Sequence, residues 1–300
     1  MLYIIDYFKQ YLTINETKKN EYQFGWKKDT KWEQQKINYL SDQFSVFTIF
    51  KYLNLYDNIK YVDLRNIHDI PIYNQLSLNS SPANAIVYCY HYELLKNENF
   101  YKNIPSRLFL YYNQYNSLIN SENDIIGTSI FSGLNILHNL GVCSEETYPY
   151  DIISEKSPSE EAYKEASENK IIAYNAIDQN IYQLKATLIN GYPILFGFNV
   201  YSSFLSDSVS ENGNVTIPSD NEELIGHHAA VIIGYDDGDK VFLVRNSWGS
   251  EWGDSGYCYI PYEYILNQNY ASDFWILKKS FYDSDYDKYN LNKQIVNKHI

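Results

Sequence analysis

The sequence predicts an α+β fold, in which a helical first half is followed by a strand-rich second half. In the first half, apolar residues recur at helical spacing, as Ala85, Ile86, Cys89 and Tyr92 do. In the second half, short β-branched or aromatic runs are separated by Gly, Asn and Asp. This change of character places the boundary between about residues 150 and 190. A groove between two such halves is the natural place for a ligand.

Four helices are expected in the first half. They are predicted over Ser81–Lys96, over Ser106–Leu118, over Thr128–Leu140 and from Ser157 onward. Pro82 suits the first turn of the first helix, where its missing N–H removes no hydrogen bond. Gly141 closes the third helix as a C-terminal signal. In the fourth, polar helix, the stretch SPSE at residues 157–160 places Pro158 just inside the start.

Strands are expected in the second half, where apolar runs alternate with turn residues. They are predicted over Ile171–Ile177, Pro193–Val200, Ala229–Tyr235, Lys240–Asn246 and Gly256–Pro261. Residues 236–239, DDGD, lie between two of these runs and are typical of a hairpin turn. A calcium-binding loop is the alternative there, but the remaining ligands and the terminal Glu of an EF-hand are missing.

The chain divides into three stretches by this pattern. Residues 1–60 are predicted to be an N-terminal extension, because polar and aromatic residues mix there without turn punctuation. Residues 61–280 are predicted to form the folded domain, helical over about 61–170 and strand-rich over about 171–280. Residues 281–300 are then a C-terminal tail.

Composition and charge exclude several classes of partner. The net charge is −13, from 24 basic and 37 acidic side chains. An acidic surface repels phosphate backbones and anionic lipids, so neither nucleic acid nor a membrane is expected as a partner. No stretch approaches the ~18 consecutive apolar residues of a transmembrane helix, and the start lacks a secretory-signal pattern. Three scattered cysteines, Cys89, Cys143 and Cys258, form no disulfide framework, and an intracellular location is expected.

The strongest local signal consists of two blocks in the second half. HAAVIIGY occupies residues 228–235, and NSWGSEWGDSGY occupies residues 246–257. In residue types and spacing, these blocks resemble the His and Asn motifs of the papain-like cysteine peptidases. Further blocks are similar to that family and to its bacterial and viral branch: FGW at 24–26, DLR at 63–65, QLSLNSSPANA at 75–85, SRLFLYYN at 106–113 and the stretch from Gly141 to Tyr150. The resemblance covers about residues 24 to 280.

The resemblance implies a papain-like fold, in which a helical half and a β-barrel-like half enclose a cleft for peptide-bond hydrolysis. A peptide or protein in that cleft is the expected partner. No cofactor and no metal are expected, and the oligomeric state stays open. Ala229, next to the expected base, would line the main specificity pocket of the family. Trp248 and Trp252 would be structural residues near the site.

The resemblance also assigns catalytic roles to four positions. His228 would be the base and Asn246 its orienting partner, with Trp248 shielding their hydrogen bond from water. Gln75 would supply the side-chain N–H of the oxyanion hole, and the backbone N–H of Ser81 would be the second donor. His227 lies beside the base, but adjacent strand residues face opposite sides, so the two are not expected to chelate a metal together.

At the nucleophile position the sequence departs from the family. The family's QGxLGSC reads QLSLNSS at residues 75–81, so both glycines and the cysteine are missing and Ser81 takes the place of the cysteine. A serine hydroxyl cannot form the thiolate–imidazolium pair, because its pKa lies far above the roughly 3.5–7.5 of an activated thiol. Leu76 and Asn79 must also take backbone angles that Gly accepts at low cost. We therefore expect hydrolysis to be lost or severely reduced.

Three functions stay open at this point. The first is a peptidase homologue that keeps a peptide-binding cleft but has little or no activity. The second is a working, slower hydrolase that uses Ser81 with His228. The third is the Cys-to-Ser form of an active cysteine endopeptidase. Ser81 also has a structural alternative as the N-cap of its helix, since serine is a favoured cap.

Overall fold

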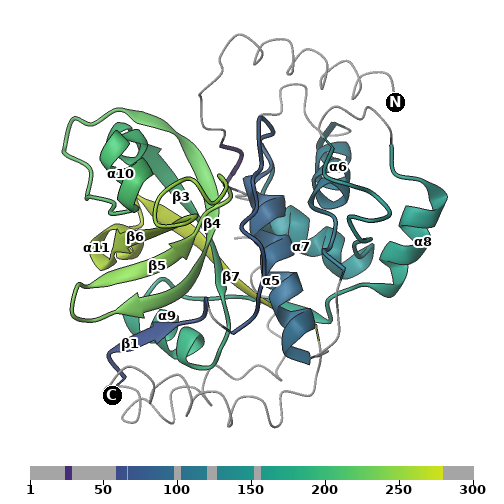
Figure 1. The fold of residues 1–300 in the computed structure, drawn as a ribbon, viewed down its shortest axis with the longest axis horizontal. Coiled ribbons are helices and arrows are strands. Elements are labelled where there is room, and N and C mark those ends of the chain that lie inside the picture. Colours follow the sequence, from purple (N-terminus) through teal and green to yellow (C-terminus); the bar gives the residue numbers. More distant parts are fainter. Residues whose placement is uncertain are drawn as a thin grey trace.

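A computed structural model describes residues 24–28, 59–65, 67–97, 103–119, 127–151 and 157–279. In these ranges a group of helices lies beside one antiparallel sheet, and the two groups form the two halves seen in Figure 1. The expected α+β fold is therefore confirmed. The predicted tail at 281–300 and most of the predicted extension lie outside the described residues.

The helical half is built around α5. Its helices are α5 (Ser81–Asn97), α6 (Arg107–Ile119), α7 (Ile130–Asn139) and α8 (Glu160–Glu168). Helix α5 packs against α6 and α7 on one side and against the sheet on the other. Most of its side chains are buried, which follows from an apolar sequence with no wide polar face.

Local capping sets where the later helices begin. The Ser129 hydroxyl accepts a hydrogen bond from the Ser132 amide at the start of α7, and the Ser159 hydroxyl accepts one from the Ala162 amide at the start of α8. The prediction that Pro158 lies inside the fourth helix was wrong. Pro158 precedes the N-cap Ser159, because the serine hydroxyl is the better partner for the first amides of the helix.

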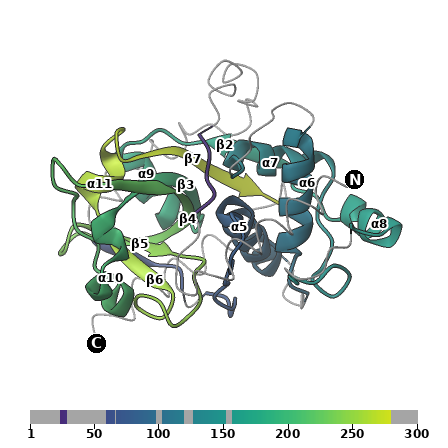
Figure 2. The same ribbon diagram turned by 90° about the horizontal axis from the view of Figure 1, so that it is seen from above.

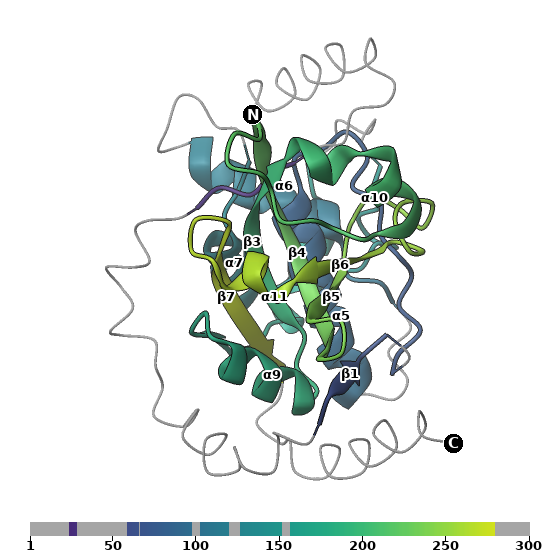
Figure 3. The same ribbon diagram turned by 90° about the vertical axis from the view of Figure 1, so that its left-hand side faces the viewer.

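The sheet contains seven strands in the described ranges. They are β1 (Tyr61–Asp63), β2 (Ala173–Ala176), β3 (Ile194–Tyr201), β4 (Leu224–Asp236), β5 (Val241–Arg245), β6 (Tyr257–Pro261) and β7 (Ala271–Lys278). Their order is β2-β7-β3-β4-β5-β6, and β1 also pairs with β4. Short helices flank them: η1 (Ser202–Leu205), α9 (Ile181–Ile189), α10 (Asp207–Asn212) and α11 (Tyr262–Leu266). Helices α9 and α10 lie at opposite ends of the sheet (Figure 3).

The predicted hairpin joins β4 to β5. The Asp236 carboxylate accepts a hydrogen bond from the Gly238 amide at 2.7 Å, and Asp236 pairs with Val241 across the two strands. This hairpin brings the end of β5 back beside the middle of β4, where Val231 pairs with Arg245. The residues that follow β5 therefore lie next to the residues that precede Val231.

Residues 24–28, which we call the strap, lie between the two halves (Figures 1 and 2). On the sheet side, the Gly25 and Trp26 amides donate to the His227 carbonyl at 3.1 and 3.2 Å. On the helical side, the Lys27 amide donates to the Thr128 carbonyl at 2.9 Å, and the Thr128 amide donates to the Gly25 carbonyl at 2.7 Å. The strap thus bonds through its backbone to both halves.

No helix in the described ranges is long and apolar enough to cross a membrane.

Candidate active site

His228 and Asn246 form the centre of the site. His228 lies on β4, and Asn246 follows the last residue of β5. The His228 Nε2 and Asn246 Oδ1 atoms are 2.8 Å apart. The Ser247 amide donates to the same Asn246 atom at 2.8 Å, which identifies that atom as the amide oxygen. His228 Nε2 therefore carries a proton and donates it, while the buried Nδ1 has no hydrogen-bond partner among the described residues.

Aromatic rings enclose the His228 imidazole. The ring centroid of Trp248 is 4.9 Å from that of His228, Phe198 is at 5.6 Å and Phe24 of the strap is at 6.3 Å. Burial lowers the pKa of His228 to about 4, and the hydrogen bond to Asn246 opposes this shift. The imidazole is consequently neutral at neutral pH, and its unpaired Nδ1 can accept a proton.

Ser81 is the first residue of α5 and is fully buried. Its hydroxyl oxygen accepts a hydrogen bond from the Ala229 amide at 3.2 Å. Since Ala229 follows His228 directly, the hydroxyl lies at the helix N-terminus against the strand that carries the imidazole. This bond crosses to the other half, and Ser81 lies within the helix and not before it. The N-cap alternative for Ser81 is therefore wrong.

Gln75 is also fully buried and makes contacts on both sides of the site. Its Nε2 donates to the Leu78 carbonyl at 2.9 Å and to the Phe24 carbonyl at 3.4 Å. Its Oε1 accepts from the Ser247 hydroxyl at 2.7 Å. The side-chain amide is thus held in place beside Asn246, with an N–H directed at a carbonyl of the strap.

The segment between Gln75 and Ser81 differs from the expectation in one respect. Leu76 has φ +53°, so it occupies the left-handed region that a glycine would accept at low cost. Asn79 has no positive φ, so the expectation of glycine-like angles was wrong at that position. The Leu76 amide donates to the Asn74 side-chain oxygen at 2.9 Å, which stabilises the turn.

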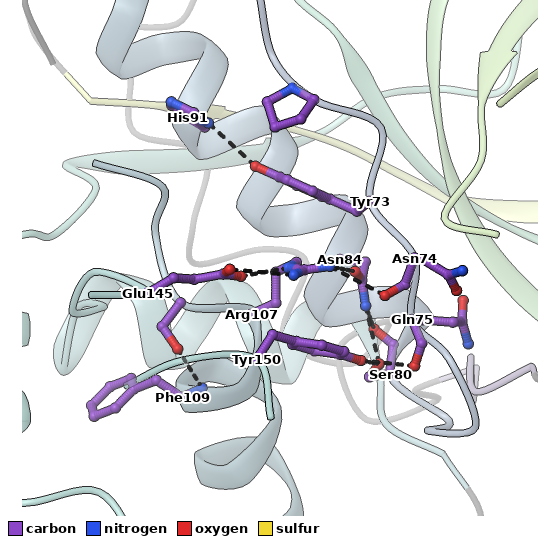
Figure 4. A network of polar contacts seen from close by, with 12 residues as sticks. Tyr73, Asn74, Gln75, Ser80, Asn84, His91, Arg107, Phe109, Glu145 and Tyr150 are labelled. Atoms are coloured by element: carbon purple, nitrogen blue, oxygen red, sulfur yellow. Dashed lines mark hydrogen bonds and ion pairs between the residues drawn. The ribbon is translucent and has the colours of Figure 1, made fainter. Parts of the chain in front are cut away.

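Arg107 contacts residues on both sides of the segment from Gln75 to Ser81 (Figure 4). Its guanidinium makes an ion pair with Glu145, with Nε 2.6 Å from one carboxylate oxygen and Nη2 3.3 Å from the other. The same group donates at 3.3 Å to the Asn74 carbonyl and at 3.3 Å to the Asn84 side-chain oxygen. It lies 4.0 Å from the ring centroid of Tyr150.

Tyr150 and Asn84 extend the network to the segment itself. The Tyr150 hydroxyl donates to the Gln75 carbonyl at 2.9 Å and lies 2.7 Å from the Ser80 hydroxyl (Figure 4). The Asn84 amide donates at 3.0 Å to both the Ser80 carbonyl and the Ser80 hydroxyl. Sequence reasoning gave no role to Arg107 or Tyr150, although both lie in blocks that resemble the family.

The remaining predicted residues lie around this centre. Trp248 separates His228 from Trp252, whose ring centroid is 5.0 Å from that of Trp248. Ala229 is buried and bonds Ser81 through its amide. The structure thus brings all seven predicted residues together, although they come from both halves. It also places Phe24 of the strap against His228 and Trp248, a contact that the sequence analysis did not predict.

Comparison with known proteins places this geometry in context. The sequence profile described as papain family cysteine protease matches residues 120–283, so the segment from Gln75 to Ser81 lies outside the match. An uncharacterized peptidase C1-like protein, L477, from Acanthamoeba polyphaga mimivirus is 40% identical over 230 residues, which are 72% of this chain and 74% of that protein.

Two solved structures are similar in fold. Xylellain, a cysteine protease from Xylella fastidiosa, superposes with a TM-score of 0.69 and 35% identity, over 76% of this chain and 89% of that one. Digestive procathepsin L 3 of the Tenebrio molitor larval midgut has a TM-score of 0.57 at 15% identity, over 90% and 98% of the two chains. The second likeness concerns the fold alone.

Proposed function

The chain belongs to the papain family of cysteine proteases, and we propose from this premise that it is a peptide-binding homologue in which Ser81 occupies the nucleophile position. Hydrolysis is then lost or severely reduced. One observation carries the proposal: a neutral His228, bonded to Asn246 at 2.8 Å, lies beside a helix that begins with a hydroxyl and not a thiol.

The chemistry of the pair explains the expected loss of activity. In this family an ionised thiolate attacks the substrate carbonyl, and the imidazole first takes the proton from the thiol. A hydroxyl keeps its proton until it is transferred during the attack, so the imidazolium that forms needs stabilisation. Asn246 orients His228 but carries no charge, so it gives less stabilisation than the carboxylate of a serine peptidase.

The contacts of the strap support a retained peptide-binding cleft. The Phe24 carbonyl accepts a hydrogen bond from Gln75 Nε2, the group predicted to bind the carbonyl of a substrate. The Gly25 and Trp26 amides bond the His227 carbonyl, next to the proposed base. A segment of polypeptide thus already occupies the groove between the halves, and an external peptide would use the same groups after the strap moves out.

A slower hydrolase that uses Ser81 is the second candidate. The neutral His228 with an unpaired Nδ1 favours it, because this is the protonation state that a general base requires. The Cys-to-Ser form of an active cysteine endopeptidase would have the same geometry.

We also propose an intracellular location for the protein. It is supported by three cysteines that are free and buried.

The test is hydrolysis of fluorescently labelled casein by the chain, by Ser81→Cys and by Ser81→Cys/His228→Ala. Each protein is also made with Gly25→Ala, because a Cβ at Gly25 would lie 2.2 Å from the Asn79 carbonyl oxygen and force the strap to shift. We expect cleavage only by Ser81→Cys, and more of it with Gly25→Ala. Cleavage by the unchanged chain that Ser81→Ala abolishes would establish the serine hydrolase instead. Silence of Ser81→Cys in both backgrounds would show that more than the nucleophile has been lost.

A further inference from the structure

Trp26 of the strap occupies a side-chain pocket one strand away from His228. A Cβ on Gly197 would lie 2.1 Å from the Trp26 indole, so the ring rests directly on the backbone of β3. Gly197 pairs with Ala229, the residue after His228. The indole also meets the His227 ring edge to face, with centroids 6.0 Å apart. The pocket therefore adjoins the site, and glycine at 197 is what leaves room for a flat ring.

A buried acid accepts a hydrogen bond from the Trp26 indole. The Trp26 Nε1 donates to one oxygen of Asp273 at 3.0 Å, and the Trp275 Nε1 donates to the other oxygen at 2.6 Å. Asp273 is only 5% exposed. Burying a carboxyl group is unfavourable without such donors, and apolar packing of an indole does not need one. Two indole donors, one of them from the strap, thus bond the two oxygens of this buried acid.

The backbone of β7 is distorted at this acid. Leu195 pairs with Trp275 and Gly197 with Ser272, so β7 carries one extra residue opposite β3. Within that bulge Asp273 has φ +66°, in the left-handed region. Bulges of this kind re-aim a side chain next to an active site, and backbone strain of this kind collects at ligand-binding positions.

The pocket continues beyond the indole. A cavity of about 460 Å³ is lined by Trp26 together with Asn199, His227 and Tyr270. Trp26, Lys27 and Lys28 of the strap therefore form part of the wall of this cavity. A peptide that displaced the strap would meet this cavity and the Asp273 carboxyl group, which would lose the Trp26 donor.

We propose that Asp273 is a specificity-determining residue, and that it makes this pocket select peptides that place a tryptophan side chain in it. The inference rests on the proposed function, since it assumes that the groove binds peptides. Phenylalanine would fill the same space but has no N–H to donate to Asp273, and the loss of that hydrogen bond to a buried acceptor costs binding energy. We expect at least a ~10-fold weaker affinity for phenylalanine, since one net hydrogen bond to a charged group is worth that factor or more.

The experiment uses the full chain with Trp26→Ala, which empties the pocket. It is titrated with a fluorescein-labelled peptide of residues 22–30, YQFGWKKDT, and with the same peptide carrying Phe in place of Trp. The Trp peptide is expected to bind at least ~10-fold more tightly. Adding Asp273→Asn should remove most of this preference, because Asn has one acceptor oxygen for two indoles and still tolerates a positive φ. Equal binding of the two peptides, a preference that survives Asp273→Asn, or binding of neither would overturn the proposal.

A second measurement covers the case in which Trp26→Ala does not fold. In the Ser81→Cys background, Trp26→Phe keeps the ring but removes the donor, so the strap should open more often and iodoacetamide should label Cys at position 81 faster. This increase in labelling rate should vanish when Trp26→Phe is made in a chain that already carries Asp273→Asn. If the effects of the two substitutions on the labelling rate are additive, the role of Asp273 is contradicted. Hydrolysis by Ser81→Cys without tryptophan selectivity would sink only this inference. If the chain prefers the Trp peptide although its Ser81→Cys variant does not hydrolyse casein, this inference stands.

Discussion

At the scale of single residues, burial decides the state of His228. The imidazole is enclosed by Trp248, Phe198 and Phe24, and burial lowers its pKa to about 4. The ordinary value is 6.5, so the folded protein holds the ring neutral at a pH where the unfolded chain already binds a proton. The burial that keeps His228 unprotonated therefore also lowers the free energy of unfolding at acidic pH.

The free energy of unfolding should fall as the pH drops from about 6.5 towards 4. The unfolded chain takes up a proton on His228 in this window and the folded chain does not, so stability rises with pH there and levels off above it. For this residue the loss between pH 7.5 and pH 5 is about 2 kcal/mol. Urea unfolding of the chain and of His228→Gln at the two pH values measures it. An equal loss in both proteins would contradict the assignment.

Leu76 stores backbone strain at the turn before Ser81. Its φ of +53° is unfavourable for any residue with a Cβ, and the side chain is 48% exposed, so little packing is lost when it is removed. Leu76→Gly should be about 1 kcal/mol more stable than Leu76→Ala, because Ala keeps the Cβ and Gly does not. Urea unfolding of the pair gives the difference. Equal stabilities would mean that the turn relaxes without cost.

At the scale of elements, the segment before α5 is held by the helical half. Arg107, at the start of α6, contacts Asn74 and Asn84 on either side of it, and Tyr150 bonds the Gln75 carbonyl between them. The ion pair with Glu145 fixes the guanidinium. The position of Gln75 and Ser81 relative to the sheet thus depends on α6 and on the stretch near residue 145.

Arg107→Met should destabilise the fold by about 3 kcal/mol, because it leaves the Glu145 carboxylate without its partner. The double variant Arg107→Met/Glu145→Gln removes the unpaired charge and should recover at least half of that loss. Chemical unfolding of the three proteins provides the comparison. If the double variant is no more stable than the single one, the cost arises from lost contacts to the Asn74 and Asn84 oxygens.

At the scale of the whole molecule, the strap connects the two halves across the site. Its backbone bonds to His227 on the sheet and to Thr128 beside α7. Ser81, Gln75 and His228 are all fully buried, and Phe24 of the strap contacts both Gln75 and His228. The two halves and the strap therefore meet at these residues.

Gly25→Ala should open the site. A Cβ at this position would meet the Asn79 carbonyl oxygen at 2.2 Å, and a backbone atom cannot move aside as a side chain can. In the Ser81→Cys background, we expect iodoacetamide to label position 81 at least ~10-fold faster. If the substitution lowers the free energy of opening the strap by about 1.4 kcal/mol, the open state is populated about ten times more often. Gly238→Ala is the matched control, because its Cβ would meet only the Asp236 side chain, at 3.1 Å. Labelling at the parent rate would show that the strap tolerates the change.

Local patterns in the sequence predicted much of the fold. Helix α5 begins at Ser81 as expected, and β3, β5 and β6 begin within one residue of their predicted starts. Strand β7 was not predicted. Its partners β2 and β3 are about 75 to 100 residues away along the chain. Asp273 was therefore missed with it. The domain boundaries at 60 and 280 stay predictions.

The sequence by itself determined the family, the fold class and a set of residues for the site, because His228, Asn246 and their neighbours stand at fixed short spacings along two adjoining strands. Only the tertiary structure decided what lies between the two halves. The bond from Trp26 to Asp273 joins residues 247 positions apart, and Arg107 reaches Glu145 and Asn74 from a helix of ordinary composition. Such contacts leave no periodic trace in the chain, because they depend on how the two halves and the strap pack together and not on the spacing of residues within one element.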